Sequence, residues 1–503
     1  MESLWLATHA LPPSPDEFVE GTHYDSVVAG AGLTGLATAV LLARAGHRVA
    51  VLEARFVGAV TTGNTTGKLS LLQGTVLHQI RHFHSDKVLR AYVDGNRQAQ
   101  EWLLQFLGER AVAVQQRDAY TYATTPDGAS TLRKELEAAL EAGLEATWSD
   151  ETELPFAVSG AIMLAGQAQF QPMEVLGAMA DELRERGGVI IENVRVTGSK
   201  GAHTPLTVET SRGDVTADHL VLCTGFPVLD RGGYFAKLTP LRSYAVAFRV
   251  LGSPESLPRG MYLNAEEPTR SLRTAPTGDE ELLLVGGNGH VVGRSDSTQA
   301  AVDGLEAWTH EHFPGAERTH AWSSQDYQSL NRVPFIGKMP RGHGNIWMGT
   351  GYNKWGMTNA VAAALSLSTQ IMGGTLEWSS VLDHRVTKPT GLASTAKLMA
   401  GVGTHLMKDW VQSEIHALPD GAPAEGTGVV GRSGASPVAR STVDGKTCQV
   451  SGVCTHMGGI VHWNDAEKSW DCPLHGSRFA PDGKVLEGPA TEDLRASAPS
   501  DAS

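Results

Sequence analysis

The sequence contains no long apolar stretch. None of its segments approaches the roughly 20 consecutive apolar residues that a membrane-spanning helix needs, although 41% of the 503 residues are hydrophobic. The start of the chain includes Leu4, Trp5 and Leu6 but lacks the basic region and the long apolar core of a secretory signal. We therefore expect neither a membrane partner nor secretion.

Basic residues and cysteines are also scarce. The 41 lysines and arginines are outnumbered by 55 acidic residues, and the formal charge of −14 argues against nucleic acid as the main partner. The chain has 4 cysteines. Two of them, Cys223 and Cys448, lie far apart in the sequence and suggest no disulfide framework. This usage predicts a reducing, cytoplasmic compartment.

The N-terminal part of the chain has the pattern of a βαβ unit. A β-rich run covers residues 24–30, and an apolar helix is expected over residues 33–45, where Gly46 ends it. A second strand is expected over residues 47–53 and ends in an acid. Helical and strand patterns then alternate, and residues 240–290 are richer in strand signals. This order predicts a Rossmann-like α/β domain with an additional sheet.

Three glycines between the first strand and the helix form a dinucleotide fingerprint. Gly30 allows a tight turn, Gly32 lets the backbone approach a pyrophosphate, and Gly35 lets the helix pack closely on the strand. The helix N-terminus then faces the phosphates, and Glu53 can accept hydrogen bonds from ribose hydroxyls. A lone G-x-G-x-x-G motif is weak, but here it follows a strand and precedes a helix and an acid, which makes a nucleotide cofactor the favoured interpretation.

A second motif near the C-terminus predicts a metal centre. Cys454 and His456 form a C-x-H pair, and Cys472 and His475 form a C-x₂-H pair. Two thiolates and two imidazoles suit a Rieske [2Fe–2S] cluster. A tetrahedral Cys₂His₂ zinc site is the alternative, and the Gly-containing loop around each pair favours the cluster.

Three further segments, together with the glycine fingerprint, carry a family resemblance. Residues 61–68 form a small polar loop, residues 217–225 a strand ending in a small-residue turn, and residues 349–358 a Gly-rich turn that opens a helix. With these segments, residues 20–375 resemble the D-amino-acid oxidase/glycine oxidase-like family of FAD-dependent oxidoreductases. Residues 332–337 are similar to the family's stretch before its last Gly-rich turn.

The resemblance implies FAD as the cofactor and amines or amino acids as substrates, oxidised by hydride transfer to the flavin. It assigns FAD binding to the fingerprint glycines and Glu53, to a backbone contact from a later strand, and to the Gly-rich turns. The additional cofactor-binding residues that it implies are Thr65, Thr66, Val194, Gly225, Gly351, Gly356, Met357 and Thr358.

Residues 419–494 resemble Rieske domains, with two departures from the respiratory-complex members. Those proteins carry an additional Cys in each loop, joined as a disulfide, whereas this chain has Gly459 and Leu474 there. They also place a Ser and a Tyr hydroxyl near the cluster sulfurs; Ser477 keeps one donor and Phe479 lacks the other. Fewer hydrogen bonds to sulfur stabilise the reduced cluster less, which predicts a potential below the top of the roughly −150 to +300 mV Rieske range.

The combined pattern predicts an α/β Rossmann-like FAD-binding domain with an interleaved sheet-based substrate domain, followed by a small all-β Rieske domain. The oxidoreductase region is expected over residues 20–384. Its FAD-binding part takes about residues 20–110, 160–235 and 325–384, and its substrate part about residues 111–159 and 236–324. A linker helix is expected over residues 385–418, the Rieske domain over residues 419–494, and a disordered tail over residues 495–503.

Lys68 is the main candidate for a catalytic role at the flavin. It lies in the polar loop that the family places by the flavin ring, where its charge could stabilise reduced flavin or tune its reactivity with oxygen. A surface lysine in a loop is the alternative. Other candidates near the substrate are Lys354, Trp355, Tyr244 and His290, with Arg242 and Arg273 considered as carboxylate clamps.

These predictions combine into one functional hypothesis. We expect an FAD-dependent dehydrogenase or oxidase that acts on an amine-like small molecule, with the cluster relaying single electrons between the flavin and an external redox partner. Electron flow from the cluster to the flavin is one alternative. A non-catalytic redox-sensing or electron-transfer module is the other.

Overall fold

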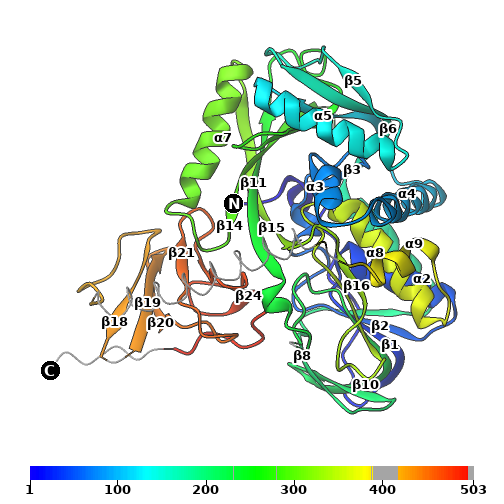
Figure 1. Ribbon diagram of the computed structural model, residues 1–503. Helices are drawn as coiled ribbons and strands as arrows, with labels where there is room; N and C mark the ends of the chain where they lie inside the picture. Colours follow the sequence, from blue (N-terminus) through cyan, green and yellow to red (C-terminus); the bar gives the residue numbers. More distant parts are fainter. Residues whose placement is uncertain (230, 279, 387, 389–416, 435, 497–503) are drawn as a thin grey trace.

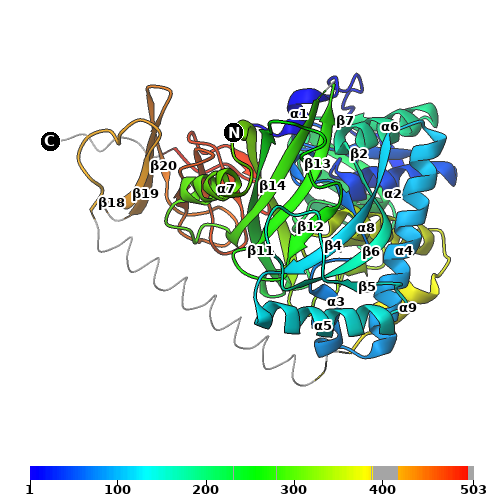
Figure 2. The same cartoon turned by 90° about the horizontal axis from the view of Figure 1, so that it is seen from above.

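The computed structural model describes residues 1–229, 231–278, 280–386, 388, 417–434 and 436–496 (Figure 1). Two large sheets and their helices form the main body, and a small β domain from the C-terminal part of the chain lies beside it (Figures 1 and 2). The predicted α/β and all-β parts are confirmed.

The first sheet contains the N-terminal βαβ unit. Its strands follow the order β16-β17-β10-β1-β2-β7, of which β17, β10, β1, β2 and β7 are parallel. β16 is antiparallel to β17, and β8 and β9 extend from β10 as an antiparallel ribbon. Every residue of β2 is buried, as expected for a parallel strand covered on both faces. The strands span His23–Ala29 (β1), Val49–Leu52 (β2), Val189–Ile191 (β7), Val196–Lys200 (β8), Leu206–Thr210 (β9), Gly213–Leu222 (β10), Phe335–Lys338 (β16) and Ile346–Thr350 (β17).

Helix α2 connects the first two strands and packs closely on the sheet. A Cβ atom on Gly35 would lie 1.9 Å from the carbonyl oxygen of Gly30, so only glycine allows this approach. α2 also packs against α6 and α8, and α4 packs against α8 and α9. The helices span Leu33–Arg44 (α2), Asp86–Glu109 (α4), Pro172–Glu185 (α6), Gly356–Ile371 (α8) and Glu377–Asp383 (α9).

The second sheet has the strand order β15-β11-β14-β13-β12-β4-β6-β3, and β5 pairs with β6. Its strands span Lys68–Leu69 (β3), Val114–Ala123 (β4), Thr147–Ser149 (β5), Gly160–Phe170 (β6), Leu238–Arg249 (β11), Met261–Asn264 (β12), Arg270–Thr277 (β13), Glu280–Val291 (β14) and Glu317–Ser329 (β15). β3 and β6 belong to this sheet although they come from segments expected in the FAD-binding part.

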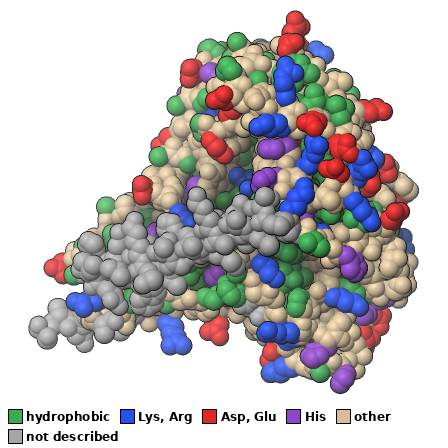
Figure 3. Space-filling view, viewed as in Figure 1, with side chains coloured by type: hydrophobic (Ala, Val, Ile, Leu, Met, Phe, Trp, Pro, Cys, Tyr) green, Lys and Arg blue, Asp and Glu red, His purple; other side chains and the backbone are tan. Residues whose placement is uncertain are grey.

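Three helices pack near the second sheet. α5 (Pro126–Glu141) contacts β4 and β6 and also α3 (Val76–Phe83), and α7 (Thr298–His312) packs on β11 and β14. On the face shown in Figure 3, acidic and basic side chains are interspersed over the upper part of the molecule, where α5 and α7 lie. Arg318 pairs with Glu306 of α7 at 3.0 Å. Two short helices, α1 (Leu4–Thr8) and the 3₁₀ turn η1 (Thr62–Asn64), contact each other, and a second 3₁₀ turn, η2, spans Tyr234–Ala236.

The C-terminal domain contains two small antiparallel sheets, β18-β19-β20 and β21-β22-β23-β24. Its strands span Gly428–Ser433 (β18), Ser436–Val443 (β19), Lys446–Ser451 (β20), His462–Asn464 (β21), Ser469–Asp471 (β22), Arg478–Phe479 (β23) and Val485–Glu487 (β24). Figure 1 shows this domain beside β11, β14 and β15, with β24 toward the main body.

Two expectations fall mainly on residues that the structure does not describe. The linker helix was expected over residues 385–418, of which residues 387 and 389–416 lie outside the described part, and the same holds for residues 497–503 of the expected tail. Within the described residues, no helix combines the length and the apolar character that crossing a membrane requires.

Candidate functional site

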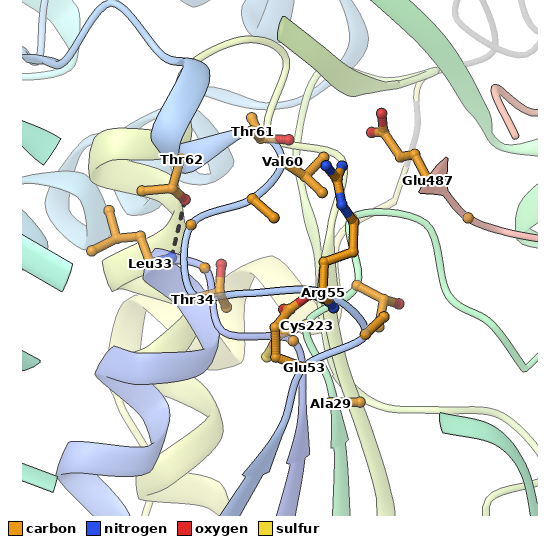
Figure 4. Close-up of a pocket in the computed structure, with 18 of the residues that line it drawn as sticks. Ala29, Leu33, Thr34, Glu53, Arg55, Val60, Thr61, Thr62, Cys223 and Glu487 are labelled. Atoms are coloured by element: carbon orange, nitrogen blue, oxygen red, sulfur yellow. Dashed lines mark hydrogen bonds between the residues drawn. The ribbon is translucent and has the colours of Figure 1, made fainter. Parts of the chain in front are cut away.

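A cavity opens at the carboxyl ends of β1 and β2, where the glycine fingerprint lies (Figure 4). Gly30 has a left-handed backbone (φ 105°), and a Cβ atom there would lie 2.6 Å from the carbonyl oxygen of Cys223. Gly32 is the N-cap of α2, whose first residues also line the cavity. The N–H of Leu33 donates to Thr62 Oγ1 at 3.1 Å, the dashed line in Figure 4. The open space in front of this helix N-terminus suits a phosphate group.

Glu53 lies at the end of β2 and is buried at the cavity wall. Its Oε2 accepts from the N–H of Ala31 at 2.8 Å, and its Oε1 accepts from the N–H of Arg55 at 2.9 Å. Burial raises the pKa of Glu53, and these two hydrogen bonds oppose that change. The carboxylate oxygens have further lone pairs and can accept from the hydroxyls of a ribose.

Of the ten predicted cofactor-binding residues other than Thr65 and Thr66, six line this first cavity. Those that line it are Gly30, Gly32, Glu53, Gly225, Gly356 and Met357. The remaining predicted residues of this group are Gly35, Val194, Gly351 and Thr358, none of which lines either of the two cavities described here.

Each of these four residues is adjacent in the chain to a residue that lines the first cavity. Gly35 carries the close contact between α2 and β1, and the N–H of Val194 donates to the carbonyl oxygen of Glu53 at 2.9 Å. Gly351 has a left-handed backbone (φ 80°), and Thr358 accepts a hydrogen bond from Gln73 Nε2 at 3.0 Å.

The cavity also has lining residues that sequence reasoning missed. Arg55 and Arg195 are its two arginines, and Asp326 lies where it meets the second cavity. Leu486, Glu487 and Gly488 of the C-terminal domain line it as well. Arg55 carries a signal in the sequence because it lies two residues after the acid of the fingerprint. The residues of the C-terminal domain carry none.

The second cavity joins the first and lies against the second sheet. Both cavities are lined by Thr61, Asp326, Gly356 and Met357. The predicted residues Thr65, Thr66, Lys68, Lys354, Trp355 and Tyr244 line the second cavity. The residues predicted from the sequence therefore lie in the walls of both cavities.

Lys68 lies in strand β3 and is buried, so the alternative of a surface lysine in a loop is wrong. Its Nζ donates to the carbonyl oxygen of Tyr262 at 2.8 Å and to Ser271 Oγ at 2.6 Å. Burial, with a smaller effect from the charge of Arg273, lowers the pKa of Lys68 to about 7. The side chain can therefore hold or release a proton near neutral pH.

Lys354 reaches the second cavity from an unusual backbone conformation. Asn353 and Lys354 both have positive φ, 55° and 68°, which costs free energy in non-glycine residues. The N–H of Lys354 donates to Asp326 Oδ2, and Asn353 Oδ1 accepts from the N–H of Ser329 at 3.0 Å. The side-chain oxygens of Asp326 and Asn353 therefore fix this turn. Burial raises the pKa of Asp326 to about 6.

The two arginines considered as carboxylate clamps are engaged elsewhere. Arg273 Nη1 donates to the carbonyl oxygens of Thr66 at 2.7 Å and Gly67 at 2.8 Å. Arg242 Nη1 donates to Glu467 of the C-terminal domain at 2.8 Å. Neither arginine lines the second cavity.

Tyr244 and His290 lie together, with Tyr244 OH 3.0 Å from His290 Nε2. Tyr244 lines the second cavity, whereas His290 does not. Burial lowers the pKa of His290, so this ring is mostly neutral at neutral pH.

The four predicted metal ligands converge in the C-terminal domain. The imidazole rings of His456 and His475 lie 5.0 Å apart, centre to centre, and nearly perpendicular to each other. Cys454 and Cys472 are buried and within hydrogen-bonding reach of each other. The Nδ1 of His475 is buried and has no hydrogen-bond partner among the described residues, as a ring nitrogen that ligates a metal requires.

Backbone groups of both loops point at the two sulfurs. The N–H groups of His456 and Met457 and the hydroxyl of Ser477 are directed to Cys454, and the N–H groups of Leu474 and His475 to Cys472. Such donors stabilise negative charge on a cluster.

Gly459 and Leu474 occupy the two positions that the Rieske resemblance matches to the disulfide-forming cysteines of respiratory-complex proteins. A Cβ atom on Gly459 would lie 2.8 Å from Leu474 Cδ1 and 2.9 Å from Cys472 Sγ. The two positions are therefore adjacent, and the glycine leaves space beside the ligand sulfur.

Both imidazole rings face the main body through Phe226. The centre of its ring lies 6.0 Å from that of His456 and 5.8 Å from that of His475. Phe226 is buried, and its chain neighbours Cys223, Thr224, Gly225 and Val228 line the first cavity. The loop that lines the first cavity therefore also contacts the imidazole rings of the metal centre.

Comparison with known proteins agrees with both sites. The profile of a family described as FAD dependent oxidoreductase matches residues 25–369, and that of the Rieske [2Fe-2S] domain matches residues 415–498. The chain belongs to the FAD-dependent oxidoreductase family. Its C-terminal part is a Rieske domain, which binds a [2Fe–2S] cluster, and its main body binds FAD.

One protein that matches nearly the whole chain and two solved structures are similar to this chain. YhfW of Bacillus subtilis, whose name describes a Rieske 2Fe-2S iron-sulfur protein, is 31% identical over 98% of this chain and 97% of its own. L-proline dehydrogenase from P. horikoshii covers 72% of this chain and 96% of its own at 16% identity (TM-score 0.60). Glycine oxidase from Geobacillus kaustophilus covers 71% and 96% at 17% identity (TM-score 0.60). The two solved structures show a shared fold.

Proposed function

We propose that this flavoprotein oxidises an amine or amino acid and that its Rieske cluster passes the electrons singly to an external acceptor protein. Such an oxidation removes a hydride from carbon and a proton from nitrogen and leaves an imine. Bound FAD supplies the hydride acceptor, and the cluster supplies a one-electron carrier. The observation that carries the proposal is the loop at Phe226, which contacts the candidate iron-ligating imidazoles and lines the dinucleotide cavity.

The two cofactors are held by different sets of side chains. Cys454, His456, Cys472 and His475 ligate the iron atoms. Gly30 and Gly32 give the FAD phosphates access to the N-terminus of α2, and Glu53 accepts from its ribose. Gly356 and Met357 line both cavities, and we assign them to the flavin end of the site.

The second cavity is the substrate site, and its charges favour an amino acid over a simple amine. Lys354 extends into this cavity and Lys68 lines it. A carboxylate of the substrate pairs with Lys354, because neither Arg242 nor Arg273 lines the cavity. Lys68, with its pKa of about 7, accepts the proton that the substrate nitrogen releases.

The presence of this cavity argues against a non-catalytic redox module. A sensor that only exchanges electrons with a partner needs no polar chamber beside the flavin, whereas this one is lined by Lys68, Tyr244 and Lys354. We place the protein in a reducing, cytoplasmic compartment, because Gly459 and Leu474 replace the disulfide of respiratory relatives.

Anaerobic stopped-flow spectroscopy tests the proposal. We expect amino acids to bleach the flavin absorbance, and the absorbance and electron-paramagnetic signal of the cluster to change afterwards. Flavin reduction with a cluster that never responds would contradict the relay. Prior reduction of the cluster by a small dye, followed by flavin bleaching without substrate, would support flow in the opposite direction.

Two phenylalanine variants separate the relay from a general effect of mutation. Phe226→Leu removes the ring between the two sites and is expected to slow the cluster phase at least about tenfold, or about 1.4 kcal/mol in the barrier, with flavin reduction unchanged. Phe235→Leu is the matched control, because Phe235 contacts His475 at 6.0 Å between ring centres but does not line the first cavity. Equal slowing in both variants would contradict a route along the Phe226 loop.

A further inference from the structure

We propose that the Rieske domain is a structural part of the FAD site: the segment Val485–Gly488 closes one wall of the dinucleotide cavity and holds its two arginines. This inference rests on the assignment of that cavity to FAD. It predicts that flavin affinity depends on residues more than 400 positions away in sequence from the glycine fingerprint.

Three consecutive residues of the C-terminal domain form this wall. Leu486 and Glu487 end β24 and Gly488 follows it, and all three line the cavity together with Gly30 and Glu53. Figure 4 shows Glu487 entering from a different ribbon and lying near Arg55, on the other side of that arginine from Glu53. The cavity is therefore bounded by both domains.

Contacts to the main body fasten the segment at each of its ends. Arg195 Nη2 donates to the carbonyl oxygen of Val485 at 3.1 Å, and Tyr327 OH donates to that of Gly488 at 3.4 Å. Between them, Glu487 accepts from Arg242 Nη2 at 3.5 Å. A segment held at three of its four positions is a fixed wall of the cavity.

The segment also acts on both arginines of the cavity. Arg195 is held by its bond to Val485, and the half-buried Arg55 faces the carboxylate of Glu487. Burial lowers the pKa of Arg55, and Glu487 is the main charge that opposes this effect. Two oriented guanidinium groups suit the paired phosphates of a dinucleotide. The C-terminal domain thus orients the cations that meet the diphosphate.

The same wall is bonded to the metal-binding loop. The N–H of Ala490 donates to Ser477 Oγ at 3.0 Å, and the hydroxyl of Ser477 is directed to Cys454. Gln325 Nε2 donates to the carbonyl oxygen of Gly476 and to Tyr327 OH, both at 2.8 Å. Since the wall is continuous with the cluster loop, bound FAD stabilises the position of the C-terminal domain by mass action.

A substitution at the wall tests the proposal by flavin affinity. A Cβ atom on Gly488 would lie 4.0 Å from Val228 Cγ1, another lining residue, so a side chain fits there and extends along the cavity. We expect Gly488→Leu to raise the Kd for FAD at least about tenfold, measured by flavin fluorescence quenching of the FAD-depleted protein with its cluster retained. Lys484→Leu is the control, because Lys484 is exposed in the turn before β24, and it should bind FAD as the wild type does.

The cluster spectrum and hydrogen exchange make the result decisive. If Gly488→Leu keeps the electron-paramagnetic signal and binds FAD as tightly as the wild type, the proposal that this segment is a wall of the FAD site is overturned. A wild type that binds no FAD would instead overturn the assignment of the cavity to FAD. If the variant does not fold, hydrogen exchange of the wild-type protein with and without FAD tests the proposal instead. We expect FAD to slow amide exchange over residues 485–490 and to leave residues 436–451 unchanged. Equal exchange at residues 485–490 with and without FAD would overturn the proposal.

Discussion

Two cationic side chains of the second sheet, those of Lys68 and Arg273, are buried. Lys68 and Arg273 lie within the second sheet and form no ion pair with a carboxylate of the described residues; both donate to backbone carbonyl oxygens instead. Burial therefore lowers the pKa of each side chain, to about 7 for Lys68 and to about 9 for Arg273. If the second cavity holds the substrate, as proposed above, a lysine that titrates near neutrality beside it makes the reaction sensitive to pH.

The titration of Lys68 predicts a pH profile. Below pH 7 the ammonium form predominates and cannot accept the substrate proton, so flavin reduction should accelerate as the pH rises through about 7. Lys68→Met should lose this inflection and at least about tenfold in rate above pH 7. Lys68→Arg keeps a permanent charge and should be slow at every pH. Stopped-flow reduction at several pH values measures this, and an unchanged inflection in Lys68→Met would exclude Lys68 as its source.

The hydroxyl of Ser477 predicts a change in the reduction potential of the cluster. Ser477→Ala removes a donor to Cys454 and should lower the potential by roughly 60 mV, the one-electron equivalent of about 1.4 kcal/mol. Phe479→Tyr restores the hydroxyl of respiratory relatives and should raise it. Redox titration followed by electron paramagnetic resonance measures both, and a potential that rises in Ser477→Ala would contradict the assignment of this donor.

Site residues that belong to a local sequence motif were predictable, whereas site residues that distant segments bring to the cavity were not. Gly30, Gly32 and Glu53 follow from the geometry of a strand, turn and helix that are adjacent in sequence. Arg195 and Glu487 enter the same cavity only because distant segments fold against it. No spacing rule connects them to the fingerprint.

The same division holds for whole elements. The first βαβ unit was predicted to within a few residues, since each of its elements has a continuous apolar pattern and a glycine boundary. Strand β3 was not predicted, because its two residues carry no periodicity and become a strand only by pairing with β6. Lys68 was therefore expected in a loop.

The N-terminal end of helix α3 is capped by a buried carboxyl group of another helix. Its N–H groups at Leu77 and His78 donate to the two carboxylate oxygens of Glu135 from α5, at 3.0 and 2.7 Å. Burial raises the pKa of Glu135 to about 8. Between about pH 4.5 and 8 the native state therefore binds more protons than the unfolded chain, and the free energy of unfolding falls as pH rises.

Replacing this carboxyl with an amide should remove that dependence. Glu135→Gln keeps an acceptor without a charge, so its stability relative to the wild type should increase from pH 5 to pH 8 by a few kcal/mol, at about 1.4 kcal/mol per unit of pKa. Glu137→Gln, at an exposed position of the same helix, is the control. Urea unfolding at both pH values measures the difference, and parallel pH curves for Glu135→Gln and the wild type would refute it.

At the scale of the whole molecule, the two domains meet across a close and charged interface. A Cβ atom on Gly293 would lie 2.8 Å from the backbone nitrogen of Pro473, and one on Gly476 would lie 2.7 Å from Pro240 Cβ. Asp465 accepts from the N–H groups of Thr298 and Gln299 at the start of α7, at 2.7 and 3.0 Å. These contacts make the C-terminal domain a fixed part of the molecule. The sequence predicted both domains but contained no rule for how they pack.

The central ion cluster of this interface gives the strongest prediction at this scale. Arg242 of β11 is 1% exposed and lies 2.8 Å from Glu467, 3.5 Å from Glu487 and 3.9 Å from Asp471. Removing one partner from a buried ionic group costs about 3–5 kcal/mol, because the remaining charges stay desolvated. We therefore expect the two domains of Arg242→Met to unfold in separate transitions. The cluster absorbance should be lost at a lower temperature than the helical circular-dichroism signal.

A second arginine of the same strand provides the comparison. Arg249 is exposed and pairs at 2.8 Å with Glu280 of the neighbouring strand β14, so Arg249→Met should change stability by less than about 1 kcal/mol. Thermal unfolding followed at the cluster band and by circular dichroism distinguishes the two variants. Coincident transitions in Arg242→Met, at the wild-type midpoint, would mean that the domains are held together by their apolar and backbone contacts and that the ion cluster adds no net stability.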